Sequence, residues 1–85
     1  MEPQSRILVV DDDYPIAKAL KYLFVQSGYE CRVAHNGVEA LEKIEEEKPD
    51  LVILDLQMPR LDGISTCRKI RENEDSRDLP VLVLT

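Results

Sequence analysis

Residues 51–54 are four consecutive apolar residues, Leu-Val-Ile-Leu, that run directly into Asp55. A short run that is apolar at every position is typical of a strand buried on both faces, as in a parallel sheet covered by helices. Ligands of such sheets bind just beyond the carboxyl ends of the strands. The run therefore predicts a covered parallel sheet, and it places Asp55 at the edge where binding or chemistry is expected.

The rest of the sequence alternates between strand and helix patterns. The other strand-like segments are residues 6–10, 29–34 and 80–85, of which 29–34 has the mixed character of an edge strand. The helix-like segments are residues 14–27, 37–47 and 63–72, preceded by the candidate N-caps Asp13, Asn36 and Asp62, and residues 73–79 form a polar loop. Connections this short force right-handed crossovers between parallel strands. The pattern predicts one α/β domain with the order β-α-β-α-β-α-β.

Apolar residues recur every three or four positions in the predicted helices, and this spacing predicts the face of each helix that packs on the sheet. The predicted inward residues are Ile16, Ala19, Leu20, Leu23 and Phe24 in the first helix, Ala40, Leu41 and Ile44 in the second, and Ile64, Cys67 and Ile70 in the third. Cys31 and Cys67 are too few and too far apart for a disulfide framework or a zinc site, so we expect two reduced thiols in the core.

The composition excludes several classes of function. The 85 residues are 44% hydrophobic and 33% charged, which suits one globular domain. A formal net charge of −6 argues against direct binding of this segment to nucleic acid. No apolar run approaches the roughly 20 residues of a membrane span, and the first residues lack a signal-peptide core. We therefore expect a cytoplasmic protein that does not bind membranes.

Acidic residues follow two of the predicted strands. Asp11, Asp12 and Asp13 come after the first strand, and Asp55 follows the strand at 51–54. If these strands are neighbours, about 4.8 Å apart, their carboxylates approach within about 4–6 Å. Such crowding must raise a pKa, bind a cation, or both, and hard carboxylate oxygens suit Mg²⁺. Helix capping after the first strand and a turn role for Asp55 are the alternatives that need no ligand.

Three segments of this sequence resemble the receiver domain of two-component response regulators. They are residues 7–13, ending in three aspartates, the D-x-x-M-P-x-x-D-G run at residues 55–63, and residues 81–85. The resemblance covers essentially the whole chain, and it implies a flavodoxin-like, doubly wound sheet with the strand order 2-1-3-4. It also implies that residues 1–85 are the N-terminal two-thirds of a receiver, without its fourth helix, fifth strand and fifth helix, whether as a fragment or as a natural short form.

The resemblance assigns a role to each residue of the motifs. Asp55 is the expected phosphoacceptor, taking a phosphoryl group from a histidine on a sensor histidine kinase or phosphotransfer protein. Asp12 is the expected direct Mg²⁺ ligand, with Asp11 assisting through water. Gln57 is expected to offer its backbone carbonyl to the metal and to place its side chain near the phosphoryl group, and Thr85 is the expected switch hydroxyl. A domain of this kind regulates a partner or output and is not an enzyme in its own right.

Two other functions stay open at this point. The family carries a lysine at the end of its fifth strand, beyond these residues, so a receiver-like binding module that is not phosphorylated is one alternative. A phosphatase that uses Asp11 and Asp13 as an Asp-x-Asp nucleophile and acid pair is the other. The apolar segment 81–84 and the first helix also predict a surface through which two chains pair. We expect His35 to be an exposed turn residue without a role, and Tyr14 to be a packing or surface residue.

Overall fold

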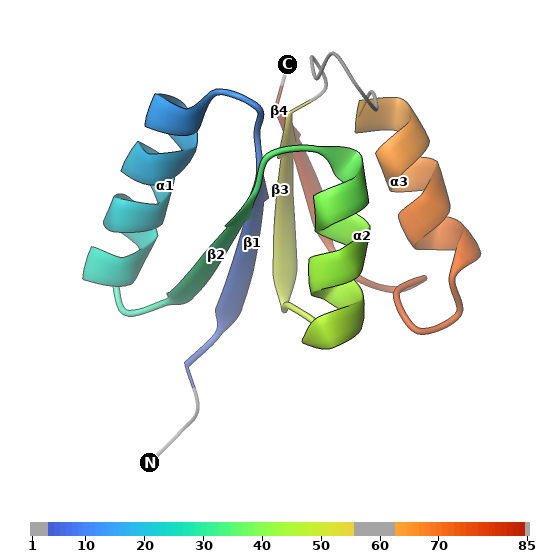
Figure 1. The fold of residues 1–85 in the computed structure, drawn as a ribbon. Coiled ribbons are helices and arrows are strands. Elements are labelled where there is room, and N and C mark those ends of the chain that lie inside the picture. Colours follow the sequence, from blue (N-terminus) through green and yellow to red (C-terminus); the bar gives the residue numbers. More distant parts are fainter. Residues whose placement is uncertain (1–3, 56–62, 85) are drawn as a thin grey trace.

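The computed structural model describes residues 4–55 and 63–84. The strands are β1 (Arg6–Val10), β2 (Glu30–Ala34), β3 (Leu51–Asp55) and β4 (Val81–Leu84), and the helices are α1 (Tyr14–Gln26), α2 (Gly37–Glu46) and α3 (Gly63–Glu72). The strands form one parallel sheet in the order β2-β1-β3-β4 (Figure 1). The predicted fold class, strand order and edge position of β2 are therefore confirmed. Asp62, the predicted cap of the third helix, lies outside the described residues.

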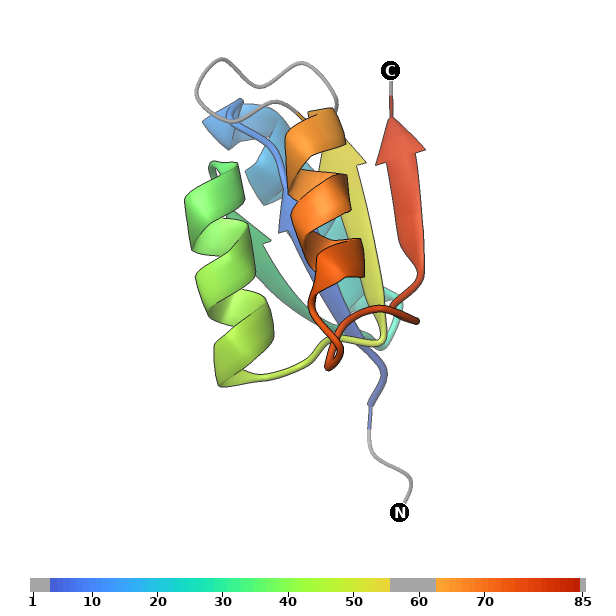
Figure 2. The same ribbon diagram turned by 90° about the vertical axis from the view of Figure 1, so that its right-hand side faces the viewer.

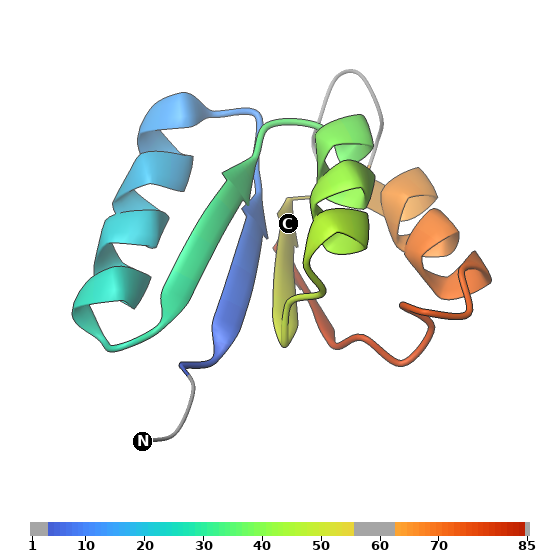
Figure 3. The same cartoon turned by 60° about the horizontal axis from the view of Figure 1, so that its bottom comes forward.

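The helices cover the sheet from both sides. Helix α1 lies against one face, and α2 and α3 lie against the other (Figures 2 and 3). Alternate residues of a strand point to opposite faces. Accordingly, Leu8 of β1 belongs to the core cluster that includes residues of α2 and α3, whereas Ile7 packs in the cluster that includes Ala17 of α1. Within the described part of the chain, no helix is long and apolar enough to cross a membrane.

Helix α1 has defined signals at both ends. The Asp13 side chain accepts a hydrogen bond from the backbone N–H of Ile16 at 3.1 Å, as the predicted N-cap should. At the other end, Gly28 has φ +97°, a left-handed conformation that residues with a side chain rarely adopt. The Tyr29 N–H then donates to the Phe24 carbonyl at 3.0 Å, and their rings meet edge to face. These contacts form a Schellman motif, which fixes the direction in which the chain enters β2.

The predicted inward face of α1 is confirmed at Leu20 and Phe24, which pack against the core, and is wrong at three other positions. Ile16 and Leu23, predicted to face the sheet, are 50% and 58% exposed, and Ala19 is exposed as well. The fully buried residue of the helix is Ala17, flanked by half-buried Leu20 and Phe24. These lie three and seven positions after Ala17, so they form one stripe. The helix packs over β1 and β2, and residues on its flanks do not reach the sheet.

The predicted inward face of α3 is confirmed at Ile70 and Cys67, which pack in the core, and is wrong at Ile64. Ile64, predicted to be inward, is 63% exposed, while Thr66 and Ile70 are fully buried. The segment predicted as a polar loop contributes to the core, because Leu79 is buried in the cluster beneath α2 and α3. Buried Ser76 donates from Oγ to the Ile70 carbonyl at 2.7 Å and so satisfies a free carbonyl at the end of the helix.

The predictions for the inward residues of α2 and for the two cysteines are confirmed. Ala40 and Ile44 of α2 are buried, and Leu41 packs against them. Both cysteines are free thiols, with Cys31 buried and Cys67 half-buried.

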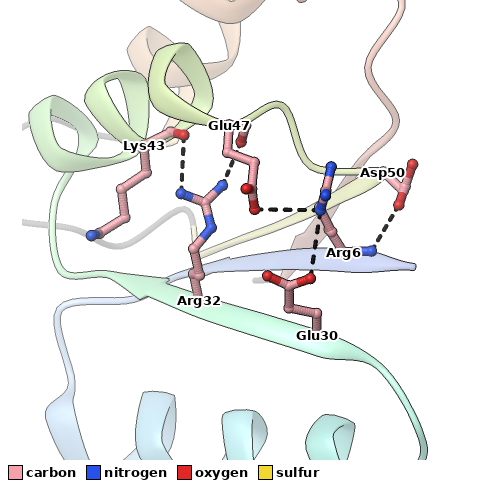
Figure 4. Close-up of polar contacts among 6 residues, drawn as sticks. All are labelled: Arg6, Glu30, Arg32, Lys43, Glu47 and Asp50. Atoms are coloured by element: carbon pink, nitrogen blue, oxygen red, sulfur yellow. Dashed lines mark hydrogen bonds and ion pairs between the residues drawn. The ribbon is translucent and has the colours of Figure 1, made fainter. Parts of the chain in front are cut away.

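A group of charged side chains braces the amino-terminal end of the sheet (Figure 4). The Arg6 backbone N–H donates to the Asp50 carboxylate at 2.7 Å, and Arg6 Nε lies 3.5 Å from Glu30 and 3.3 Å from Glu47. The Arg32 guanidinium donates to the carbonyl of Lys43 at 3.2 Å and to that of Glu47. Arg32 therefore caps the C-terminus of α2 from the neighbouring strand. This brace lies at the opposite end of the strands from the acidic residues.

Candidate functional site

The carboxyl ends of β1 and β3 lie side by side. The two strands pair in parallel with Val10 opposite Leu54, so the next residue on each strand is an aspartate. Carboxylate oxygens of Asp11, Asp12 and Asp55 all lie within 4.8 Å of one another. The predicted convergence of acidic side chains at this edge is therefore confirmed.

Hydrogen bonds at the end of β1 give Asp11 and Asp13 different roles. The Asp11 N–H donates to the Ala34 carbonyl at 3.0 Å, which continues the ladder between β1 and β2 by one residue. Its carboxylate Oδ1 accepts from the Asp13 N–H at 2.9 Å and turns the chain toward α1. Asp13 is exposed and caps the helix, whereas Asp12 and Asp55 are half-buried beside Asp11. Three carboxylates are thus grouped, and the fourth has a local structural role.

The pKa of the Asp11 carboxyl is raised by its surroundings. Asp11 is only 5% exposed, and burial raises this pKa above the ordinary value. The hydrogen bond from the Asp13 N–H lowers the pKa, but the charges of Asp55 and Asp12 and a side-chain hydrogen bond to Asp55 raise it further. Two unit charges 4.8 Å apart repel by about 3.5 kcal/mol at an effective dielectric of about 20. The protein thus maintains a costly concentration of negative charge at this edge.

The donor set fits a small, hard divalent cation. The grouped atoms of Asp11, Asp12 and Asp55 are carboxylate oxygens, and Mg²⁺ binds through one or two carboxylates together with water and phosphate. The described residues place this group at the carboxyl edge of a doubly wound sheet, where ligands of such folds bind. Asp13 is not part of the group, and its side chain caps α1. The Asp-x-Asp phosphatase alternative, which needs Asp11 and Asp13 to act as a pair, finds no support in this arrangement.

The sequence-based interpretation missed one feature of this edge. His35, expected to be exposed, is half-buried, and its ring stacks on Tyr14 with centroids 3.7 Å apart and planes 11° from parallel. Its Nδ1 lies 3.3 Å from the backbone carbonyl oxygen of Asp11. A histidine that directly follows β2 was the available signal, because β2 ends at the same edge as β1 and β3.

Two predicted site residues, Gln57 and Thr85, lie outside the described residues. Their assigned roles stay predictions.

The fold and the acidic cluster define the class of protein: a doubly wound parallel α/β domain with a carboxylate site at the carboxyl edge of its sheet. More specifically, the chain belongs to the response regulator receiver domain family, which it matches over residues 7–85. The resemblance inferred from the sequence motifs is thereby confirmed.

Individual relatives agree with this assignment. The chain is 51% identical over 80 residues to the response regulator MprA of Mycobacterium ulcerans, a match that covers 94% of this chain and 34% of that protein. Among solved structures, the N-terminal domain of a response regulator receiver protein from Methanoculleus marisnigri superposes with a TM-score of 0.91 at 40% identity, covering 94% of this chain and 65% of that one. The chemotaxis protein CheY4 of Vibrio cholerae gives 0.92 at 28% identity, covering 95% and 68%. The chain therefore spans about a third of the length of MprA.

Proposed function

We propose that this domain receives a phosphoryl group on Asp55 in a reaction that depends on Mg²⁺, and that the phosphorylated form switches the interactions of a partner or output domain. The observation that carries the proposal is the convergence of three carboxylates at the carboxyl edge of β1 and β3. A cluster this acidic fits both a divalent ion and the phosphoryl group that the ion would accompany. Membership of the receiver family supports the same function.

In the proposed reaction, a carboxylate oxygen of Asp55 attacks the phosphorus of a phosphohistidine on the donor. A P–O bond forms to Asp55 as the P–N bond breaks, and the histidine leaves as neutral imidazole after its nitrogen takes a proton from solvent. Asp55 suits this task because it ends a buried strand and remains half-buried rather than enclosed. The strand holds its backbone, and the side chain stays within reach of a donor.

Asp11, Asp12 and Asp55 would hold the metal, with Asp12 as a direct ligand and Asp11 acting through water. The exposures support this division, since Asp12 is half-buried and Asp11 is buried and engaged by the Asp13 N–H. A bound Mg²⁺ would neutralise the charge that builds up between the carboxylates and the phosphoryl oxygens. The Gln57 carbonyl belongs to the same proposed ligand set.

The proposed partner is a sensor histidine kinase or a phosphotransfer protein, and the proposed location is the cytoplasm. The register of the sheet supports a role for Thr85 as the switch hydroxyl, because Leu84 pairs with Asp55 and Thr85 is the next residue in the sequence. We further propose that residues 1–85 form the N-terminal two-thirds of a receiver. Pairing of two copies through β4, where Leu82 and Leu84 are exposed, and through the exposed face of α1 is part of the same proposal.

The test is phosphorylation by a small-molecule donor. We expect incubation with phosphoramidate and Mg²⁺ to add the mass of one phosphoryl group to the protein, and we expect hydroxylamine to remove it, as it does from an acyl phosphate. Asp55→Asn should gain no mass, and EDTA should prevent the gain in the wild-type protein. Asp13→Asn is the matched control, because asparagine also caps helices and Asp13 lies outside the carboxylate group.

The same experiment decides between the proposal and the binding-module alternative. A wild-type protein that binds Mg²⁺ but gains no mass from the donor would favour a receiver-like module that is not phosphorylated. A mass gain that survives in Asp55→Asn would place the phosphoacceptor elsewhere and refute the assignment of Asp55.

A further inference from the structure

Two aromatic rings connect the first two loops at the acidic edge of the sheet. Tyr14 is the first residue of α1, and His35 follows the last residue of β2. Their rings stack in parallel with centroids 3.7 Å apart, although Tyr14 as a whole is 64% exposed. An aromatic ring at the surface gains little from burial, so this stack needs a different explanation from core packing.

The stack is one of several contacts that fix His35. Its backbone N–H donates to the Glu39 carboxylate at 3.3 Å, and Asn36 beside it caps α2 through the Glu39 N–H at 2.9 Å. The backbone of His35 is therefore held at the start of α2, and its ring is held by the stack at the start of α1. A ring fixed in this way can donate a hydrogen bond in a constant direction.

The partner of the His35 ring is the peptide group between Asp11 and Asp12, the first two of the three aspartates that follow β1. Nδ1 lies 3.3 Å from the Asp11 carbonyl oxygen. A carbonyl oxygen can only accept, so the geometry requires the proton on Nδ1. On the other side of the same residue, the Asp11 N–H donates to the Ala34 carbonyl at 3.0 Å. Asp11 is thus held by β2 at its N–H and by His35 at its carbonyl, and the direction in which Asp12 leaves the strand follows from both.

We infer that His35 is a positioning residue for the carboxylate site: held by its stack on Tyr14, it donates from Nδ1 to the Asp11 carbonyl and so fixes the orientation of Asp11 and Asp12 toward Asp55. The inference rests on the proposed function of the site as a Mg²⁺ site. Residues that orient metal ligands from outside the coordination sphere contribute to affinity because the ligands no longer need to be ordered on binding. In this role His35 would act through Asp11 and would not itself be a metal ligand.

Two substitutions of His35 separate the hydrogen bond from the ring. His35→Asn keeps an N–H donor close to the place of Nδ1 but removes the ring, and His35→Phe keeps a ring for the stack but removes the donor. We expect calorimetric titration with Mg²⁺ to show affinity weakened by roughly three- to tenfold in His35→Phe, at or below the lower end of the usual effect of such residues. We expect His35→Asn to retain most of the wild-type affinity.

Tyr14 provides a second pair of variants at an exposed position. We expect Tyr14→Phe, which preserves the stack, to bind Mg²⁺ like the wild-type protein. We expect Tyr14→Ala to weaken binding by about twofold, because the His35 ring loses the stack that holds it. Urea denaturation in EDTA, measured on every variant, reports the purely structural effect of each change.

The outcomes distinguish this inference from the function on which it rests. Wild-type affinity in His35→Phe, or equal losses in His35→Phe and His35→Asn, would overturn the positioning role and leave the proposed function intact. A purely structural role would shift the denaturation midpoint in EDTA while the folded protein kept its affinity, and that result would also overturn it. A wild-type protein that binds no Mg²⁺ would overturn both the inference and the proposed function.

Discussion

Replacing Asp11 by asparagine removes one charge from the carboxylate cluster and changes the shape of the side chain little. The asparagine Oδ1 can still accept the hydrogen bond from the Asp13 N–H, so the turn into α1 is preserved. We therefore expect this substitution to stabilise the metal-free protein at neutral pH. The direction is unusual, because most substitutions of buried residues are destabilising.

The structure indicates the size of this effect. Asp11 lies within 4.8 Å of both Asp12 and Asp55, and each of these pairs repels by about 3.5 kcal/mol at an effective dielectric of about 20. Solvent around the half-buried Asp12 and Asp55 screens a large part of this repulsion. We therefore expect a gain of about 2 kcal/mol in the free energy of unfolding, which corresponds to a rise of roughly 1–2 M in the urea midpoint.

The pH dependence of the gain follows from the raised pKa of Asp11. Burial raises this pKa in the folded state above the ordinary value of 3.8, so the folded protein binds the proton more tightly than the unfolded chain. The stability that the protonated Asp11 carboxyl contributes to the folded protein is fully present below the ordinary pKa, and it is lost as the pH rises through the folded-state pKa. The advantage of Asp11→Asn should therefore be largest at pH 7 and should shrink as the pH approaches 4.

The assay is urea denaturation in EDTA at pH 7 and pH 4.5, repeated at pH 7 with saturating Mg²⁺. The metal should stabilise the wild-type protein more than the variant and so reduce or reverse the difference. Asp13→Asn, at an exposed capping position outside the cluster, should change the unfolding free energy by less than about 0.5 kcal/mol. An Asp11→Asn protein no more stable than wild type at pH 7 in EDTA, or equally stabilised at both pH values, would refute the electrostatic reasoning.

Four further substitutions test the packing and capping of the fold, each by urea denaturation. Ile70→Ala should destabilise the protein by about 3 kcal/mol because Ile70 is fully buried, whereas Ile64→Ala on the same helix should cost less than about 0.5 kcal/mol; similar costs would contradict the observed face of α3. Gly28→Ala should cost about 1 kcal/mol, because alanine disfavours the left-handed φ of +97°, and an unchanged midpoint would argue against the Schellman motif. Arg32→Lys should cost about 1 kcal/mol of stability, because one ammonium group cannot reproduce the donors that cap α2. It should leave phosphorylation of Asp55 unchanged. An unchanged stability would show that Arg32 does not stabilise the end of α2.

Local signals in the sequence predicted the strands and the aspartates at their ends, and the family resemblance implied the strand order that makes β1 and β3 neighbours. The run at 51–54 is apolar at every position, and the aspartates follow directly where strands end. Once β1 and β3 are neighbours in a parallel sheet, Asp11 and Asp55 must meet at one edge. No knowledge of side-chain packing is needed for that conclusion.

The helix faces could not be predicted as well, because periodicity alone does not determine the centre of the buried stripe. In α1 the small Ala17 is fully buried, and the larger Ile16 and Leu23 are exposed. Which flank is covered depends on the strands under the helix, and α1 lies over β1 and β2. The same limit explains why Ile64 was placed inside.

The contact between Tyr14 and His35 depends on two loops that are distant in the sequence. Tyr14 follows β1 and His35 follows β2, and only the pairing of these strands brings the residues together. The position of His35 directly after β2 indicated the edge of the sheet at which it lies, but it did not indicate the stack on Tyr14. The carboxylate cluster was therefore predictable from the sequence, whereas the groups that hold it in place were not.

The most direct test of the central claim is a crystal structure grown with Mn²⁺ as a substitute for Mg²⁺, in which anomalous scattering locates the metal. We predict one strong anomalous peak among the carboxylates of Asp11, Asp12 and Asp55, with Asp12 and Asp55 at ligand distance. Absence of a peak there at saturating Mn²⁺, or a peak that contacts neither Asp12 nor Asp55, would contradict the claim that these carboxylates form one metal site.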